Sequence, residues 1–184
     1  AITAGVLANF ASEIGIIELP FMYPSREVAY KVLDDQEVKD RFTAYCDAKG
    51  FAFIGYTENE FRDLTNSRGP IRKPEDLKGL KIRVVESPVF IDTFKALGAN
   101  PTPLPFPEIY NALQQKVIDA QDNPLYTSIL MKFTEVNKHA TLTSHILTEC
   151  PVVVNRKFWA RLTSGQKKLF MDAAQIQIRV NREG

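Results

Sequence analysis

Alternating helix and strand patterns along most of the chain predict an α/β fold with largely parallel sheets. Amphipathic stretches, with apolar residues three and four positions apart, alternate with short β-rich runs as far as the last helical pattern. Glycines and capping residues mark several helix ends. In folds of this kind ligands bind at the carboxyl ends of strands, so polar residues there are the first candidates for a site.

The charge balance excludes several classes of partner. The chain has 23 Lys and Arg residues against 22 Asp and Glu residues, and a net charge of +1 provides no field for nucleic acid or an anionic membrane. No apolar run approaches the roughly 18 to 20 residues that a bilayer span needs, so the chain is not expected to be a membrane protein. Cys46 and Cys150 are too few for a disulfide framework, and we expect two buried or partly buried thiols.

Both ends of the sequence resemble interior sequence. The chain opens on the apolar, strand-like segment Ala1–Leu7, without a Met or a basic leader, and it closes inside a helical pattern, Gln166–Glu183. We interpret the chain as an interior piece of a longer protein.

The first half contains clear element boundaries. Asp34 and Asp35 begin a predicted helix that stops at Gly50, and the runs Phe51–Tyr56 and Leu80–Val85 are typical of strands. Ser87 and Pro88 then provide the N-cap and first residue of a second helix, which closes at Gly98. The inward residues of the two helices are Val38, Phe42, Tyr45 and Cys46, and Phe90, Ile91, Phe94 and Leu97.

The second half repeats this pattern up to a capping box that opens the last helix. The expected elements are an extended segment Thr102–Phe106, a helix Pro107–Lys116 with Ile109, Tyr110 and Leu113 inward, a strand Val117–Gln121, a helix Leu125–Phe133, strands Ala140–Leu147 and Pro151–Val154, and the capping box Thr163–Gln166.

Two segments are predicted to be crossings between domains. Thr57–Pro74 is polar and rich in Asn, Arg, Gly and Pro, and Thr148–Pro151 interrupts two apolar runs. Residues 60–148 would then form most of one lobe, and residues 1–59 and 149–184 would belong to another.

Catalytic constellations are sparse, which argues against an enzyme. No glycine-rich phosphate loop, GxSxG or HExxH motif occurs, and no Cys, His and Asp cluster has metal-ligand spacing, so we expect no cofactor and no metal. His139 and His145 are interpreted as surface or satisfied histidines. The acidic pairs Asp34–Asp35 and Glu58/Glu60 more simply mark a helix start and a solvated loop.

Arg83 is the residue that stands out. It alternates with Ile82 and Val84 on a predicted strand that ends just before the helix at Ser87, where an α/β sheet binds ligands. A guanidinium group there offers a planar fork of donors that matches a carboxylate. The alternative is a surface arginine on an edge strand. Asn123, before Pro124, is similarly either a turn residue or a directed donor.

Several motifs in order and spacing resemble the extracytoplasmic solute-binding proteins of TRAP transporters. The resemblance covers the whole chain, and that family is longer at both ends, so the fragment would lack the N-terminal strands and C-terminal helices. The segments that carry it are Asp76–Val84, Leu97–Pro103, Phe106–Gln114, Val117–Pro124 and Lys132–Val136.

This resemblance implies a protein of the periplasmic binding protein type, with two α/β lobes joined by chain crossings and the ligand in the cleft. Such a protein is not an enzyme; exported to the periplasm, its signal peptide removed, it delivers an organic acid anion to membrane permease subunits. By the same resemblance Arg83 forms the carboxylate salt bridge, with Arg62, Asn123 and Phe106 as further ligand residues. Asp122 in place of the usual Glu and Ala120 in place of the usual Gly are departures that bear on the pocket's shape.

Glu86 and Ser87 are expected to set selectivity. A carboxylate beside Arg83 would disfavour a second ligand carboxylate and favour a hydroxylated tail, which points to a sugar acid or other hydroxylated carboxylate. Alternatively, Glu86 points outward or caps the next helix. Other functions also stay open: a C4-dicarboxylate binder or ligand-sensing module of the same fold, or an α/β enzyme fragment acting on carboxylates, for which no nucleophile or acid–base pair is apparent.

Overall fold

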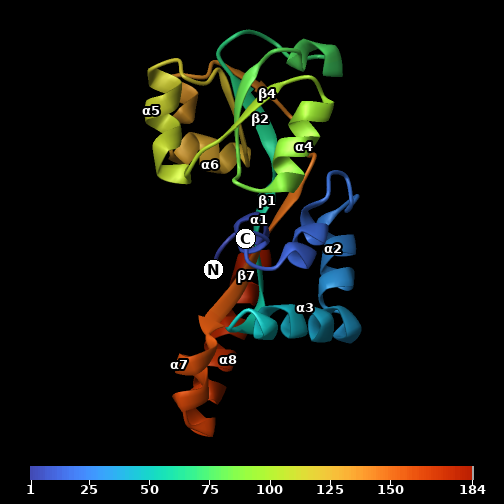
Figure 1. Ribbon diagram of the computed structural model, residues 1–184, viewed down its shortest axis with the longest axis vertical. Coiled ribbons are helices and arrows are strands. Elements are labelled where there is room, and N and C mark those ends of the chain that lie inside the picture. The colour runs from blue at the N-terminus through green and yellow to red at the C-terminus, as the bar shows by residue number, and fades with distance from the viewer. Residues whose placement is uncertain (184) are drawn as a thin grey trace. The chain divides into compact units, whose positions relative to one another are not determined.

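The computed structural model describes residues 1–183, which divide into two compact units (Figure 1). Unit 1 consists of Ala1–Glu18, Met22–Asn59 and the chain from Leu147 onward, and unit 2 consists of Leu19–Phe21 and Glu60–Ile146. The predicted boundaries between the lobes lie at 59/60 and 148/149. The boundaries between the units lie at 59/60 and 146/147, and residues 19–21 also belong to unit 2.

Unit 1 is built from helices around a two-stranded ribbon of β1 and β7. Backbone hydrogen bonds from Arg156 to Gly50 and from Arg62 to Ile146 fit strands that run in opposite directions. The elements are α1 (Ala4–Leu7), η1 (Ser12–Glu18), α2 (Arg26–Leu33), α3 (Gln36–Ala48), β1 (Phe51–Phe61, whose last two residues belong to unit 2), β7 (Leu147–Asn155), α7 (Arg156–Arg161) and α8 (Ser164–Glu183).

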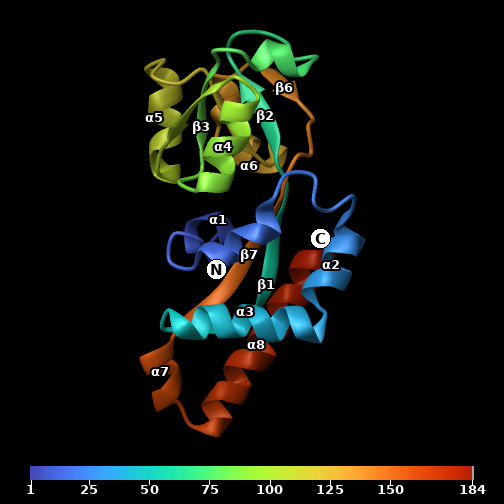
Figure 2. The same ribbon diagram turned by 45° about the vertical axis from the view of Figure 1, so that its right-hand side comes forward.

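The predicted helix after Asp35 is confirmed as α3, which lies across the ribbon (Figure 2). The Asp35 carboxylate caps it by accepting hydrogen bonds from the backbone N–H groups of Glu37 and Val38, at 2.9 and 3.3 Å. Phe42 is buried, and its ring lies 5.0 Å from that of Phe53 and 4.9 Å from that of Tyr56. This aromatic cluster joins α3 to β1.

The predicted capping box at the start of α8 is also confirmed. The Gln166 N–H donates to Thr163 Oγ1 at 3.3 Å, and the Thr163 N–H donates to Gln166 Oε1 at 2.9 Å. Near its other end, the Asn181 side chain bonds the backbone N–H and carbonyl of Glu58 at 2.8 and 3.1 Å, which ties α8 to β1.

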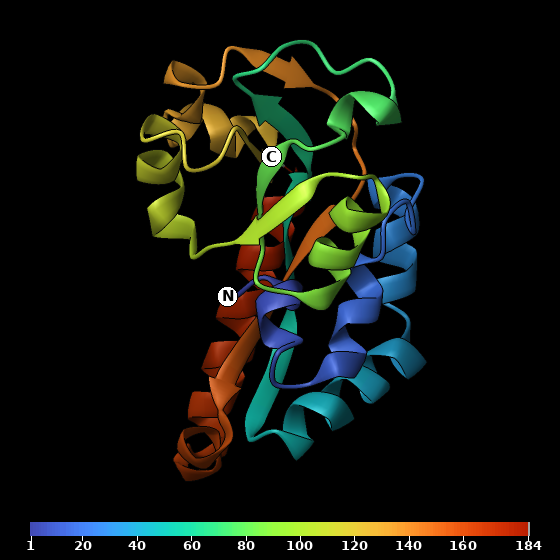
Figure 3. The same ribbon diagram turned by 45° about the horizontal axis from the view of Figure 1, so that its top comes forward.

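Unit 2 contains a five-stranded sheet in the order β4-β3-β5-β2-β6, with α4 on one face and α5 and α6 on the other (Figures 1 and 3). Its elements are β2 (Asp63–Asn66), η2 (Pro74–Leu77), β3 (Lys81–Val84), α4 (Pro88–Ala96), β4 (Asn100–Pro103), η3 (Phe106–Glu108), α5 (Ile109–Gln114), β5 (Ala120–Asn123), α6 (Leu125–Leu130), η4 (Phe133–Glu135) and β6 (His139–Thr141).

The α/β class is confirmed, but the sheet is mixed and not largely parallel. β3 is parallel to β4 and β5, whereas β2 is antiparallel to β5 and β6. The parallel pairs follow from the crossover helices α4 and α5, which return the chain to the same end of the sheet. No crossover helix connects β1 to β2, and β2 runs antiparallel to its neighbours β5 and β6.

The two predicted polar crossings are largely strand. β1 extends to Phe61 and β2 begins at Asp63, while β7 contains the whole segment Thr148–Pro151. Polar side chains in these segments are buried because they find partners: Thr57, for example, donates through Oγ1 to the Cys150 carbonyl at 3.0 Å.

Other element boundaries also differ from the predictions. The start of the chain forms the short helix α1 and not a strand, and β5 begins only at Ala120 because Lys116 turns the chain with φ +59°. Similarly, Lys132, at φ +60°, separates α6 from η4. The strand expected from Ala140 to Leu147 is divided: β6 ends at Thr141 and β7 starts at Leu147. The extended segment Thr102–Phe106 is β4, shifted to Asn100–Pro103, and the helix Pro107–Lys116 is η3 plus α5.

The helix after Ser87 is confirmed as α4, with Phe90 and Phe94 fully buried. Gly98 adopts φ +77°, as expected for a glycine that ends a helix. Leu97, predicted to face inward, is instead 37% exposed, because the helix has already ended at Ala96. Within residues 1–183, no helix has both the length and the apolarity to cross a bilayer.

Candidate functional site

Three of the expected ligand residues of unit 2 lie where strands end or begin on the same side of its sheet. β3 and β5 are parallel, with Arg83 in register with Gln121, so the carboxyl ends of both strands lie on the same side of the sheet. β2 is antiparallel to β5 and pairs Asp63 with Asn123. The first residue of β2, which follows Arg62, therefore lies beside the carboxyl end of β5. The topology therefore gathers Arg62, Arg83 and Asn123 from three separate parts of the sequence.

Arg62 is buried and paired inside the protein. Its Nε lies 2.8 Å from Asp122 Oδ2, and its Nη2 donates to the Asp122 carbonyl oxygen and, at 3.3 Å, to Asn123 Oδ1. The guanidinium carbon also lies 5.0 Å from the centre of the Phe90 ring. Arg62 is thus held from several directions, and a large part of its charge is balanced by Asp122.

His145 lies beside this buried ion pair, a position that its interpretation as a surface or satisfied histidine did not specify. Its Nε2 lies 3.5 Å from Asp122 Oδ2, and its Nδ1 is 2.8 Å from Thr143 Oγ1. Burial raises the pKa of Asp122, but Arg62 and His145 outweigh burial and hold that pKa below its usual range. His139, by contrast, is only partly buried, on β6.

Arg83 is buried in the middle of the sheet, so the alternative of a surface arginine on an edge strand is wrong. Its Nε and Nη2 both donate to the Leu104 carbonyl oxygen, at 2.9 and 2.7 Å. No carboxylate of residues 1–183 lies within ion-pair distance of it. Burial lowers the pKa of Arg83 to about 10, with Arg62 acting in the same direction and Asp122 and Glu86 opposing, so the group stays cationic at neutral pH.

Asn123 is a buried donor and acceptor as well as the residue before a turn. Its Nδ2 donates to Gln121 Oε1 at 2.5 Å, while its Oδ1 accepts from Arg62. Gln121 in turn donates to the hydroxyl groups of Thr65 and Ser128, at 2.7 and 2.8 Å. Sequence reasoning missed Gln121, because only the strand pairing reveals that it links β5 to β2.

The remaining expected residues differ in exposure. Glu86 is exposed, and Ser87 is buried at the N-cap position of α4, but its Oγ makes no hydrogen bond within the described chain. Phe106 is 38% exposed and stacks edge-on against Phe133, at 6.0 Å between ring centres. Phe106 lies two residues after Leu104 in the sequence, and the Leu104 carbonyl oxygen accepts hydrogen bonds from Arg83. Phe106 therefore follows closely on the backbone group that holds Arg83.

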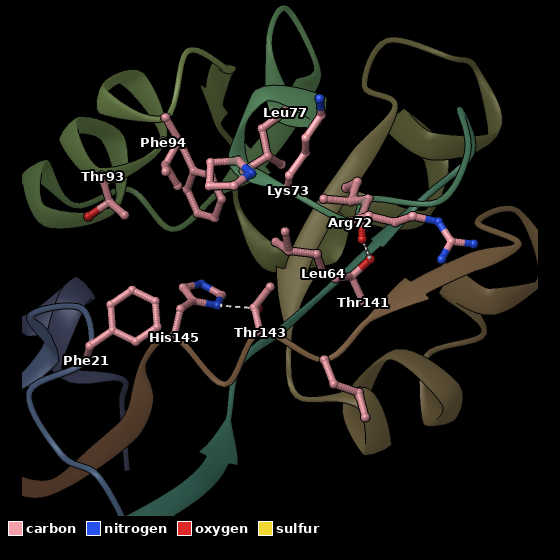
Figure 4. Close-up of a pocket in the computed structure, with 14 residues that line it drawn as sticks. Phe21, Leu64, Arg72, Lys73, Leu77, Thr93, Phe94, Thr141, Thr143 and His145 are labelled. Atoms are coloured by element: carbon pink, nitrogen blue, oxygen red, sulfur yellow. Dashed lines mark hydrogen bonds between the residues drawn. The ribbon is translucent and has the colours of Figure 1, made fainter.

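Unit 2 also contains an apolar cavity of about 380 Å³, shown in Figure 4. Phe94 and His145, whose ring centres lie 5.6 Å apart, are among its walls, together with Phe21, Leu64 and Leu77. None of the six expected ligand residues lines it. Neither Arg62 nor Arg83 lines this cavity, but His145, which does, lies 3.5 Å from the Asp122 carboxylate that pairs with Arg62.

No cluster of His, Cys, Asp and Glu side chains within residues 1–183 has the geometry to hold a metal ion. Cys46 is buried and Cys150 half-buried, and both are free thiols, as expected.

Fold and site together define an α/β protein in which buried arginines lie at the ends of strands. The model of the family described as bacterial extracellular solute-binding protein, family 7, matches residues 1–183, and the chain belongs to this family.

Named relatives agree with this assignment. The chain is 39% identical, over 91% of its length, to the 2,3-diketo-L-gulonate-binding periplasmic protein YiaO of Escherichia coli, of which it covers 51%. A crystal structure of a TRAP periplasmic solute-binding protein from a Polaromonas species, bound to D-erythronate, superposes with a TM-score of 0.94 at 37% identity, covering 99% of this chain and 60% of that one. The sugar acid-binding protein DctPAm of Advenella mimigardefordensis, in complex with galactonate, also gives 0.94, at 36% identity, covering 98% of this chain and 58% of that one. The chain spans about half the length of the curated relative and three fifths of these structures.

Proposed function

We propose that this chain is part of a periplasmic solute-binding protein that captures an organic acid anion, a sugar acid or another hydroxylated carboxylate, and delivers it to the permease subunits of a TRAP-type transporter. Units 1 and 2 would be parts of its two lobes. In this proposal the protein binds its solute without transforming it. Membership of the family and the sugar acids bound by its relatives support this proposal.

The observation that carries the proposal is the buried charge of Arg83. A guanidinium group has five N–H donors, and Leu104 uses two of them, which leaves three. Because Nε and Nη2 share one acceptor, the Nη1 and Nη2 edge stays available, and two parallel donors there match the two oxygens of a carboxylate. A ligand carboxylate would also supply the counter-charge that this buried cation lacks.

The remaining expected residues would shape the rest of the pocket. Arg62, Asn123 and Phe106 would line it, with Arg62 fixed by Asp122 so that it contributes a positive potential and little conformational freedom. Ser87, with its unused hydroxyl group, could bond a ligand hydroxyl, and Glu86 could do the same from its exposed position. These roles favour a monocarboxylate with a hydroxylated tail over a C4-dicarboxylate.

Isothermal titration of the full-length protein with D-erythronate, D-galactonate and succinate tests this function. We expect a sugar acid to bind more tightly than succinate. Arg83→Ala should lose about 2 to 5 kcal/mol of binding free energy, roughly 30- to 4,000-fold in affinity. Arg68→Ala, at an exposed arginine of the same unit, is the matched control and should bind like wild type. Undiminished affinity in Arg83→Ala would exclude the proposed role of Arg83.

A ligand-sensing module of the same fold is the second candidate, because closure around a solute can be read by a receptor as well as by a permease. Reconstitution separates the two functions. The full-length protein should support solute uptake into vesicles that contain its cognate permease, and a sensing module should not.

A further inference from the structure

We propose that unit 1 contains a proton-binding site at Glu149: this carboxyl group holds a proton in the folded protein near neutral pH and releases it as the pH rises, which weakens unit 1. Glu149 belongs to unit 1, whereas Arg62 and Arg83 belong to unit 2. The inference does not depend on the proposed solute-binding function.

Glu149 is deeply buried on β7. Its side chain is 1% exposed, and Oε1 has no hydrogen-bond partner within the described chain. Burying an ionised carboxylate away from water and hydrogen-bond donors costs much free energy, whereas burying the neutral acid costs much less. Its position therefore favours the protonated form.

The neighbouring acids add to this effect. Glu58 on β1, Glu18 at the end of η1 and Asp34 after α2 each act electrostatically on Glu149, and all three disfavour a further negative charge. Arg182 on α8 opposes them. The other titratable or charged groups around this cluster are Tyr56 on β1, Tyr23 after η1, Arg26 and Tyr30 on α2, Cys46 on α3 and Lys39 beside Asp34.

The cations of the cluster are engaged with other acids. Arg26 Nε lies 3.0 Å from Glu58 Oε1, and Tyr30 donates its hydroxyl to Glu58 Oε2 at 2.6 Å. Arg182 Nη1 lies 2.6 Å from Asp34 Oδ2, and its guanidinium carbon lies 4.3 Å from the centre of the Tyr30 ring. Glu149 itself forms no ion pair within residues 1–183.

Two buried phenols complete the surroundings. The hydroxyl groups of Tyr23 and Tyr56 make no hydrogen bond within the described residues, and both side chains are more than nine-tenths buried. Burial first, and then charges that include Glu149, raise the pKa of both tyrosines, so they stay neutral. A neutral carboxyl group, able both to donate and to accept, is the form that fits neutral polar neighbours.

The direction of the pH effect follows from linkage. Burial, followed by repulsion from Glu58, raises the pKa of Glu149 from 4.5 to about 8. Between these values the folded state holds one more proton than the unfolded state, so stability falls as the pH rises, and the unfolding constant grows by up to tenfold per pH unit. The stabilising contribution is complete below about pH 4.5 and is lost as the pH rises through about 8.

Infrared spectroscopy of the full-length protein tests the site directly. At pH 6.5 the wild type should show the carbonyl band of a protonated carboxyl group, and this band should disappear on titration through about pH 8. Glu149→Gln should lack the band, whereas Glu13→Gln, at an exposed glutamate of the same unit, should retain it. A wild-type spectrum without the band, or a band that persists in Glu149→Gln, would overturn the proposal.

Urea unfolding between pH 5 and 8 measures the consequence. Trp159, the single tryptophan of these 184 residues, lies on α7 in unit 1, so its fluorescence reports the unfolding of this unit. Glu149→Gln should reduce the slope of the logarithm of the unfolding constant against pH by about one proton. Equal slopes in variant and wild type would contradict the inference. If the variant does not fold, the absence of the band from the wild-type spectrum still overturns the proposal.

Discussion

Arg83 donates both Nε and Nη2 to the carbonyl oxygen of Leu104, at 2.9 and 2.7 Å, so a backbone dipole and not a carboxylate anchors this buried cation. The anchor fixes the plane of the guanidinium group. It leaves the outer pair of donors in a set direction, which is the preorganisation that a carboxylate-binding residue needs.

Arg83→Lys should therefore bind a sugar acid poorly although the charge is kept. A single ammonium group cannot satisfy the Leu104 carbonyl and also present two parallel donors. We expect a loss of about 10- to 100-fold in affinity, between wild type and Arg83→Ala, measured by isothermal titration with D-erythronate. An Arg83→Lys protein with wild-type affinity would show that charge alone, and not the planar fork, holds the ligand.

Glu86→Gln should change selectivity more than affinity. Glu86 is exposed and acts electrostatically on Arg83, so its removal relieves repulsion of a second ligand carboxylate. We expect the affinity for succinate relative to D-erythronate to rise about 3- to 10-fold in paired titrations.

The control for this change is Glu75→Gln, an exposed glutamate of η2 that should leave the ratio unchanged. If Glu86→Gln also leaves it unchanged, Glu86 points away from the ligand, which is the alternative that the sequence left open.

Sequence patterns predicted the α4 helix and the position of Arg83 because both depend on local signals. The proline and glycine of α4 lie at its ends, and Arg83 alternates with apolar neighbours on one short strand. These signals act over a few residues, so they can be read without knowledge of the fold.

Tertiary pairing explains what the sequence did not reveal. His145 and Asp122 are 23 positions apart and meet only because the chain returns beside β2 after β6. For the same reason β1 and β7 continue through polar residues that a local pattern assigns to loops: Thr57 is stabilised by the carbonyl of Cys150, on the partner strand. Both cases depend on partners that lie far away in the sequence.

Phe42→Ala should destabilise unit 1 strongly. The ring is 4% exposed and packs against two other aromatic rings, so its removal leaves a cavity between α3 and β1. We expect a loss of about 3 to 5 kcal/mol in the free energy of unfolding, followed through Trp159 fluorescence. Phe10→Ala, at a ring that is 57% exposed, should cost about 1 kcal/mol. Similar losses in the two variants would mean that α3 is not packed as described.

Asp122→Asn should destabilise unit 2 because it removes the counter-charge of a buried arginine. Arg62 would keep its charge and lose its partner at 2.8 Å, a change that costs about 3 to 5 kcal/mol in other buried pairs. Urea unfolding monitored by far-UV circular dichroism measures the loss. Asp92→Asn, at an exposed position on α4, is the control and should change the free energy of unfolding by no more than about 0.5 kcal/mol.

The same variant should also alter the response to acid. Although burial raises the pKa of Asp122, Arg62 and His145 hold it below 3.8, so the unfolded state takes up this proton at higher pH than the folded state. The stability that Asp122 contributes is therefore present above about pH 4 and is lost as the pH falls through the folded pKa. Asp122→Asn should lack this loss of stability in acid, so its free energy of unfolding should depend less on pH between about 5 and 2. A variant as acid-sensitive as wild type would show that Asp122 is not ionised in the folded protein, and that Arg62 is balanced by another group.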